Sequence, residues 1–141
     1  MAVHSSYDFM LLQMVEGKVM FSVENGAGII SVTFEPLNGN SYWLCDGYWH
    51  NIQAVKTKNV VTLSIDGHSS TPGIGQAGVS STDTKDPLYV GGVPDPTGLR
   101  GMNTMQNFVG CMRYVELNGV IQKLVDGRAF GNVTLNSCPT I

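Results

Sequence analysis

Residues 9–34, FMLLQMVEGKVMFSVENGAGIISVTF, decide the fold class of this chain. Apolar residues in this segment recur with the two-residue period of a β-strand, as Val19, Phe21 and Val23 do. Asn25-Gly26 is a strong hairpin signal between two such runs. The pattern predicts three strands, over Phe9 to Met14, Lys18 to Val23 and Ile29 to Phe34. We expect them to form an antiparallel meander.

Short strands separated by turns continue along the rest of the chain. They are predicted over Trp49 to Val55, Val60 to Ile65, Leu88 to Val90 and Phe108 to Leu117. Thr71 to Ser81 is a Gly- and Ser-rich connection, and Val93 to Asn107 is a loop long enough to suggest a function. Because no segment shows a sustained helical period, we predict an all-β sandwich or barrel.

Composition agrees with this class and restricts the partners. The 141 residues fit one domain, 1–141, and include 17 glycines, 6 prolines and only 13% charged residues. A formal net charge of −3 gives no general attraction to nucleic acid. No apolar run reaches the roughly 18 residues of a membrane span, so we expect no membrane insertion. The first residues lack the pattern of a signal peptide, which predicts that a secreted form is a piece of something longer.

The chain has three cysteines, an odd number. A bridge between Cys111 and Cys138 would close the C-terminal segment into a loop, contribute about 3.5 kcal/mol and indicate an oxidising compartment. Cys45 would then be either a buried thiol or the partner of a cysteine outside this chain. Asn132-Val133-Thr134 is an acceptor sequence for N-glycosylation, which is consistent with secretion.

Catalytic motifs are not evident. His4, His50 and His68 lie on different segments without the spacing of a zinc site, and we interpret His50, placed in a predicted strand, as structural. Gly73, Gly75 and Gly78 spell G-x-G-x-x-G, but a Ser/Thr-rich stretch rather than a helix follows them. A flexible connection explains them better than dinucleotide binding. The sequence therefore argues against an enzyme.

Four oxygen-bearing residues stand beside predicted strands: Asp8, Asn25, Ser81 and Asp83. Calcium takes roughly six to eight oxygen ligands, but these residues do not have the compact spacing of a calcium loop. Judged by themselves, they are ordinary turn residues.

Four motifs in order resemble the laminin G-like family, and most closely the laminin α chains. They are Asp46-Gly47-Tyr48-Trp49-His50, Leu63-Ser64-Ile65-Asp66-Gly67, Leu88-Tyr89-Val90-Gly91-Gly92, and Phe108-Val109-Gly110-Cys111 with Leu117-Asn118-Gly119 and a closing Cys138. The resemblance implies an antiparallel two-sheet jelly-roll sandwich with a Ca²⁺ ion at one rim. Asp8 and Asp83 match the two acidic ligands of the family, and Asn25 and Ser81 match the positions that supply backbone carbonyls.

The chain departs from the family pattern in two places. The family has additional strands before the position of Asp8, which predicts an N-terminally truncated domain with one uncovered sheet edge and possible self-association through it. Cys45 is the second departure, because the pattern requires no cysteine before Asp46-Gly47.

The resemblance implies a secreted adhesion module of the extracellular matrix or basement membrane. Such a module would bind a cell-surface glycoprotein, glycan or receptor through the calcium-bearing rim. Two alternatives remain open, a structural spacer in a tandem array and a lectin-like or small-molecule carrier. Ca²⁺-dependent glycan binding would separate the first function from the spacer, and a closed apolar pocket between the sheets would favour the carrier.

Overall fold

The fold is described from a computed structural model of the chain. The structure describes residues 2–4, 8–35, 39, 43–78, 82, 88–93, 95, 101–104 and 106–138, with backbone only for residues 2–4. The chain divides into two compact units, Met1–Asn107 and Phe108–Ile141. Each unit is described separately.

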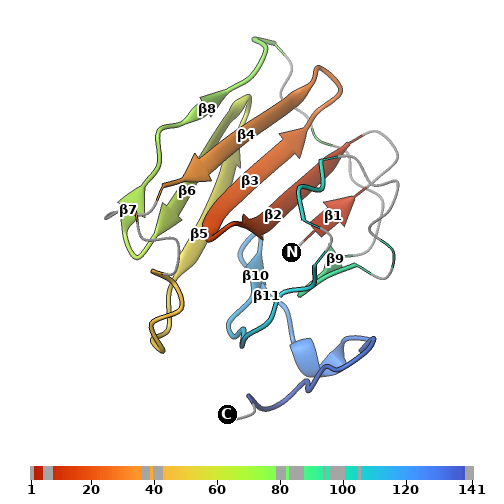
Figure 1. Cartoon of the computed structure of the whole chain (residues 1–141). Coiled ribbons are helices and arrows are strands. Elements are labelled where there is room, and N and C mark those ends of the chain that lie inside the picture. Colours follow the sequence, from red (N-terminus) through yellow and green to blue (C-terminus); the bar gives the residue numbers. More distant parts are fainter. Residues whose placement is uncertain are drawn as a thin grey trace. The chain divides into compact units, whose positions relative to one another are not determined.

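The first unit contains a five-stranded antiparallel sheet (Figure 1). Its strands are β1 (Ala2–His4), β2 (Phe9–Val15), β3 (Lys18–Glu24), β4 (Ile29–Phe34) and β9 (Leu88–Tyr89), in the order β4-β3-β2-β1-β9. The β2-β3-β4 meander is confirmed, with Leu12 opposite Phe21 and Phe21 opposite Val32. Strand β1 pairs with β2 on one side and β9 on the other, so the sheet continues beyond the strand that follows Asp8.

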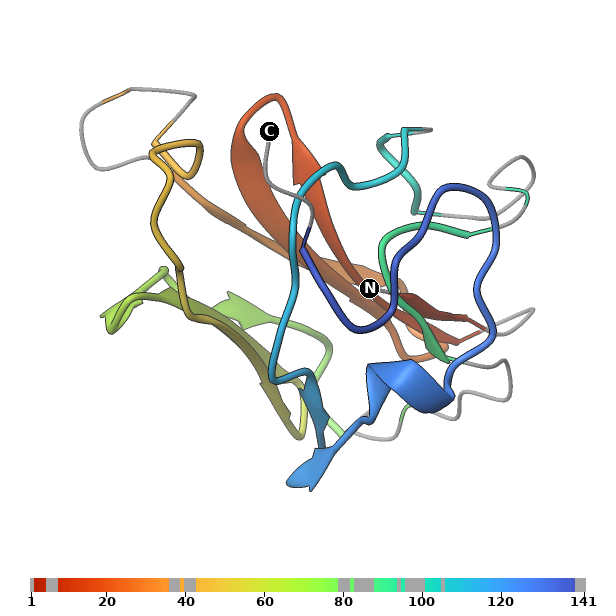
Figure 2. The ribbon, with the colours of Figure 1, turned by 90° about the horizontal axis from the view of Figure 1, so that it is seen from below.

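A second sheet packs against the first within this unit, and Figure 2 shows the two as separate layers. It contains β5 (Ile52–Thr57), β6 (Val60–Ile65), β7 (His68–Ser69) and β8 (Gly73–Ile74). The order is β5-β6-β7, and β8 pairs with β6 beside Val60 and Val61. Two antiparallel sheets placed face to face confirm the predicted sandwich.

The space between the sheets is filled by alternate side chains of β3, β4 and β6, as the two-residue period requires. This core consists of Val19, Phe21, Val23, Ile30, Val32, Phe34, Val61, Leu63 and Ile65. Full burial of each large apolar side chain contributes roughly 1.5–3 kcal/mol. A smaller cluster of Phe9, Leu11 and Val93 lies on the opposite face of β2, with Tyr89 and Met102 packed against it.

The second unit contains a hairpin, a short helix and a disulfide. The hairpin joins β10 (Glu116–Leu117) to β11 (Val120–Ile121), and the 3₁₀ helix η1 covers Leu124–Asp126. Cys111 and Cys138, 27 residues apart, form the disulfide. None of the described residues of this unit is fully buried, so these residues form no apolar core of their own. The disulfide is therefore the main constraint on this unit.

Two predicted strands differ from the structure. The strand predicted from Trp49 begins only at Ile52. The carboxylates of Asp46 and Asp66 bind the backbone amides of residues 48 and 51, and Asp66 also binds the imidazole ring of residue 50, so this segment does not pair as a strand. The strand predicted over Phe108 to Leu117 is reduced to Glu116–Leu117. Positive φ angles at Gly110 (153°) and Tyr114 (53°) interrupt the extended backbone before it.

The beginning of the Gly-rich stretch after Thr71 pairs with β6 as strand β8, contrary to the predicted flexible connection. Gly73 belongs to β8, and a Cβ atom built on Gly75 would clash with Cδ1 of Ile30. The Asn59 side chain donates a 3.0 Å hydrogen bond to the Gly75 carbonyl, and the Gly75 amide donates one of 2.8 Å to the Asn59 carbonyl. These two glycines therefore allow close packing on the core.

Candidate functional site

The structure brings two of the four predicted calcium ligands to one end of the first sheet. Asp8 immediately precedes β2, and Asn25 immediately follows β3. Because Phe9 pairs with Glu24, Asp8 and Asn25 stand beside each other at the same strand ends. A Cβ atom built on Gly26 would lie 3.9 Å from Asp8 Oδ1, which places the carboxylate against the hairpin turn.

The turn itself is organised by a carboxylate that sequence reasoning missed. Glu24 is only 5% exposed, and its Oε1 accepts hydrogen bonds from the amides of Gly26 (2.8 Å) and Gly28 (3.0 Å). These two glycines have φ angles of 91° and 118°, a conformation that favours glycine. The signal available in the sequence was a glutamate directly before Asn25-Gly26.

The Asn25 side chain is used inside the turn, because its Oδ1 accepts a 3.2 Å hydrogen bond from the Ala27 amide. This arrangement suits the prediction that Asn25 would offer its backbone carbonyl to a cation. Ser81 and Asp83 lie outside the described residues. Carboxylate and carbonyl oxygens fit the preference of a hard cation, and the assignment of Ca²⁺ to these four residues stays a prediction.

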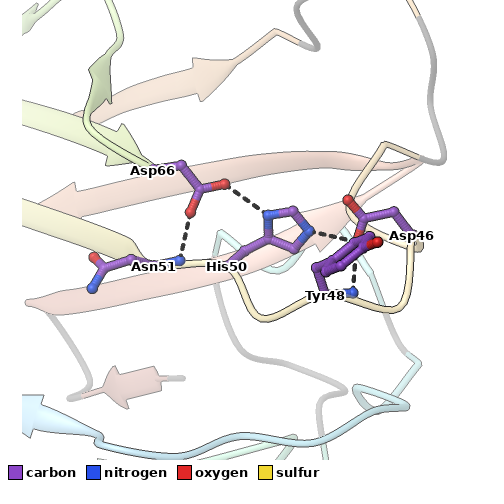
Figure 3. A network of polar contacts seen from close by, with 5 residues as sticks. All are labelled: Asp46, Tyr48, His50, Asn51 and Asp66. Carbon is purple, nitrogen blue, oxygen red and sulfur yellow. Dashed lines mark hydrogen bonds and ion pairs between the residues drawn. The ribbon is translucent and has the colours of Figure 1, made fainter.

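A second polar cluster lies where the second sheet begins (Figure 3). His50 Nδ1 is 2.7 Å from Asp66 Oδ2, and His50 Nε2 is 2.9 Å from Asp46 Oδ1. The same carboxylates also accept backbone hydrogen bonds, Asp66 Oδ1 from Asn51 (2.8 Å) and Asp46 Oδ1 from Tyr48 (2.9 Å). The imidazole thus connects the bend at residues 46–48 to the turn between β6 and β7.

Aromatic packing completes the surroundings of the His50 ring. Trp43 meets the ring edge-on, with centroids 6.1 Å apart, and stacks on Phe34 at 5.5 Å. The His50 side chain is 15% exposed, whereas those of Asp46 and Asp66 are 41% and 40% exposed. The ring is therefore nearly enclosed, while its two carboxylate partners remain in contact with solvent.

The hydrogen bonds shift the pKa values of all three groups. The bond to Asp66 is the main cause that raises the pKa of His50 above its usual 6.5, with Asp46 adding to it. The pKa of Asp46 is lowered by the Tyr48 amide and then by His50, and that of Asp66 by His50 and then by the Asn51 amide. The cluster therefore favours an imidazolium between two carboxylates.

This geometry gives His50 a structural role rather than that of a general base. Both ring nitrogens are already engaged by carboxylates, so the ring has no free nitrogen with which to accept a substrate proton. Within the described part of the chain, no three His, Cys, Asp or Glu side chains gather in a way that could hold a metal ion. The structural interpretation of His50 holds, although the residue lies outside a strand.

The remaining predicted residues fall at the surface. Asn132 is exposed, as a glycan acceptor must be, and Cys45 is a free, exposed thiol. The alternative of a buried thiol at Cys45 is therefore wrong. In the described residues there is also no helix of the length and apolar character needed to span a membrane.

A two-sheet antiparallel sandwich, in a chain whose second unit carries a disulfide, is a β-sandwich module of the kind found in secreted proteins. A family model of the laminin G domain matches residues 1–120, and the chain belongs to that family. Its fold is accordingly the antiparallel jelly-roll sandwich of laminin G domains.

Individual proteins agree with this assignment. The chain is 39% identical over 132 residues to laminin subunit alpha-1 of Mus musculus, covering 91% of this chain and 4% of the relative. Laminin subunit alpha of Drosophila melanogaster is 31% identical over 139 residues, covering 98% of the chain and 4% of the relative. The solved structure of domains LG4-5 of the mouse laminin alpha1 chain superposes with a TM-score of 0.87 at 34% identity, covering 99% of this chain and 38% of that one.

The chain thus spans 4% of the length of these curated laminin relatives. It is a binding module of the type carried by laminins, which are proteins of the extracellular matrix.

Proposed function

We propose that this domain is an adhesion module that binds a cell-surface glycoprotein, glycan or receptor through a calcium-bearing rim. The rim would be formed by the carboxylates of Asp8 and Asp83 and the backbone carbonyls of Asn25 and Ser81. The position of the Asp8 carboxylate against the turn after β3 carries this proposal, because it joins two predicted ligands from separate strands.

The chemistry of such a rim explains how it would recognise a ligand. Two carboxylates and two carbonyls leave part of the calcium coordination shell to water or to an acidic oxygen of the ligand. Extracellular calcium modules bind the ion at roughly 0.1–1 mM, so the ligand would strengthen the site that it completes. An acidic glycan is the ligand class that suits this arrangement.

The proposed function is binding without catalysis, in a secreted protein of the extracellular matrix or basement membrane. The Cys111–Cys138 disulfide supports an oxidising compartment, and the two carboxylate contacts of His50 support a structural role for this imidazole. The carrier alternative gains no support from the core, since the space between the sheets is occupied by large side chains such as Phe21, Phe34 and Leu63.

The direct test is calorimetric titration of Ca²⁺ into the metal-free protein and into the variants Asp8→Asn and Asp83→Ala. We expect millimolar or tighter binding that either substitution weakens at least about tenfold, since each removes one charged ligand. Asp126→Asn, on the exposed helix of the second unit, is the matched control and should bind as the wild type does. A folded wild type without Ca²⁺ binding would refute the rim and leave the spacer function.

A second measurement tests the ligand. Binding to an immobilised acidic glycan should require Ca²⁺, disappear with EDTA and be reduced in Asp8→Asn. Binding that persists in EDTA would show that the domain recognises glycans by another surface. Normal Ca²⁺ binding without any glycan or receptor binding would favour the spacer.

A further inference from the structure

The backbone segment 46–51 is attached to the second sheet through the His50 cluster and Asn51. It contains no strand residues, and it reaches the β6–β7 turn through His50–Asp66 and through two hydrogen bonds between Asn51 and Asp66. The two backbone-linked contacts are Asn51 N to Asp66 Oδ1 (2.8 Å) and Asp66 N to Asn51 O (2.9 Å). The imidazole is the element that extends this attachment to Asp46.

Each ring nitrogen of His50 faces a carboxylate oxygen at less than 3 Å, namely 2.7 Å for Asp66 and 2.9 Å for Asp46. Both contacts are hydrogen bonds only when both nitrogens carry a proton, because a carboxylate can only accept. In the neutral ring one nitrogen would direct its lone pair at an oxygen that carries negative charge. The geometry therefore selects the doubly protonated ring.

No other charged group among the described residues contacts the ring. Asp46 approaches from the bend before it and Asp66 from the β6–β7 turn, and the remaining neighbour, Trp43, is uncharged. The charge state of the cluster is thus set by one proton on one imidazole.

The segment held in this way presents two aromatic side chains to solvent. Tyr48 is 78% exposed and Trp49 is 51% exposed, and both lie between the two residues that the cluster joins, Asp46 and His50. Exposed aromatic residues on a rigid loop are effective contacts for a binding partner. We expect a change in the cluster to alter the position of this pair.

We propose that the Asp46–His50–Asp66 cluster is a proton-controlled latch, which holds the bend at residues 46–48 against the β6–β7 turn while His50 is doubly protonated and releases this bend when one proton is lost, while Asn51 stays bonded to Asp66. The latch would keep Tyr48 and Trp49 in a fixed arrangement at acidic to neutral pH. It would loosen them as the pH rises. This inference is independent of the calcium rim, which uses other residues.

Intrinsic fluorescence offers a specific test, because one of the two tryptophans of the chain, Trp43, contacts the His50 ring and the other, Trp49, lies between Asp46 and His50. Tryptophan emission and the His ring proton signals in NMR would be followed from about pH 5 to about pH 9. We expect His50 to titrate above its usual pKa of 6.5, and the emission to change with the midpoint of His50.

Three variants make the result decisive. His50→Gln should abolish the emission change, whereas His68→Gln should leave it intact. Asp66→Asn should move the midpoint to lower pH, and asparagine tolerates the positive φ of 51° at this position. If His50→Gln fails to fold, the shift of the emission midpoint in Asp66→Asn is the deciding result. Constant emission across the pH range, or the same emission midpoint in Asp66→Asn as in the wild type, would overturn the latch.

Discussion

Gln13 and Gly101 are 88 residues apart in the chain, yet Gln13 Nε2 donates a 3.1 Å hydrogen bond to the Gly101 carbonyl oxygen. The Oε1 atom of the same amide accepts a 2.9 Å hydrogen bond from the Asn103 backbone. The side chain of Gln13 therefore pairs with the backbone of the long loop as a neighbouring strand would. This contact fixes the loop segment 101–103 to the outer face of β2.

Removing this amide should destabilise the domain. Gln13 is only 6% exposed, so Gln13→Ala would leave the Gly101 carbonyl and the Asn103 amide without their partner at a cost of roughly 1–3 kcal/mol in the free energy of unfolding. Gln53→Ala, on the exposed side of β5, is the control and should change stability by less than about 0.5 kcal/mol. Equal urea midpoints for the two variants would contradict the role of Gln13.

Gly101 should tolerate no side chain. It has a φ of 81°, and a Cβ atom there would lie 2.5 Å from Cζ of the buried Phe9. Gly101→Ala should therefore lower the free energy of unfolding by about 1–3 kcal/mol more than Gly78→Ala does. Gly78 has nearly the same φ, 83°, and nothing within 4 Å of its Cβ position. Gly78→Ala therefore measures the cost of placing alanine at a positive φ without a steric clash. Thermal unfolding of both variants would test this difference.

Stability should depend on pH through the His50 cluster. The folded pKa of His50 is raised above 6.5, so its contribution is complete below that pH and is lost as the pH rises through the folded value. The pKa values of Asp46 and Asp66 are lowered from 3.8, so their contributions are complete above 3.8 and are lost as the pH falls through the folded values.

The urea midpoint should accordingly fall on the alkaline side of pH 6.5 in the wild type and in His68→Gln, and this fall should be smaller in His50→Gln. A midpoint that depends on pH in the same way in all three proteins would show that His50 makes no such contribution.

Self-association of the domain should involve β4. This strand is an edge of its sheet, and residues 29–34 contain no charged residue or proline that would discourage pairing with another chain. We expect a concentration-dependent dimer in sedimentation experiments, which Thr33→Lys on the edge should weaken. Thr62→Lys on the internal strand β6 is the control. A wild-type monomer at all concentrations would refute this prediction.

Asn132 should carry an N-linked glycan when the domain is secreted from eukaryotic cells, because its acceptor sequence is exposed in the second unit. Thr134→Ala should remove the corresponding mass, and Asn118→Gln should not. Secreted wild-type protein with the unmodified mass would exclude this site.

The sequence by itself was sufficient for the regular parts of the fold. Alternating apolar residues placed β4 and β6 at their observed bounds, because each strand buries one face and the two-residue period records that burial. Asn25-Gly26 and Asp66-Gly67 marked turns for an equally local reason, since both need backbone conformations that few residues adopt. Asp8 and Asn25 could be assigned to one rim only through the resemblance to laminin G-like domains.

The tertiary structure alone decided what distant residues do to one another. The observed start of β5 depends on Asp66, which lies in a later turn and accepts a hydrogen bond from the Asn51 amide. The second unit is irregular before Glu116 although its apolar residues suggested a longer strand, because positive φ angles there are not encoded in hydrophobic periodicity. Contacts such as Gln13 with Gly101 join segments through space, and their energies depend on burial and geometry that no local pattern of residues specifies.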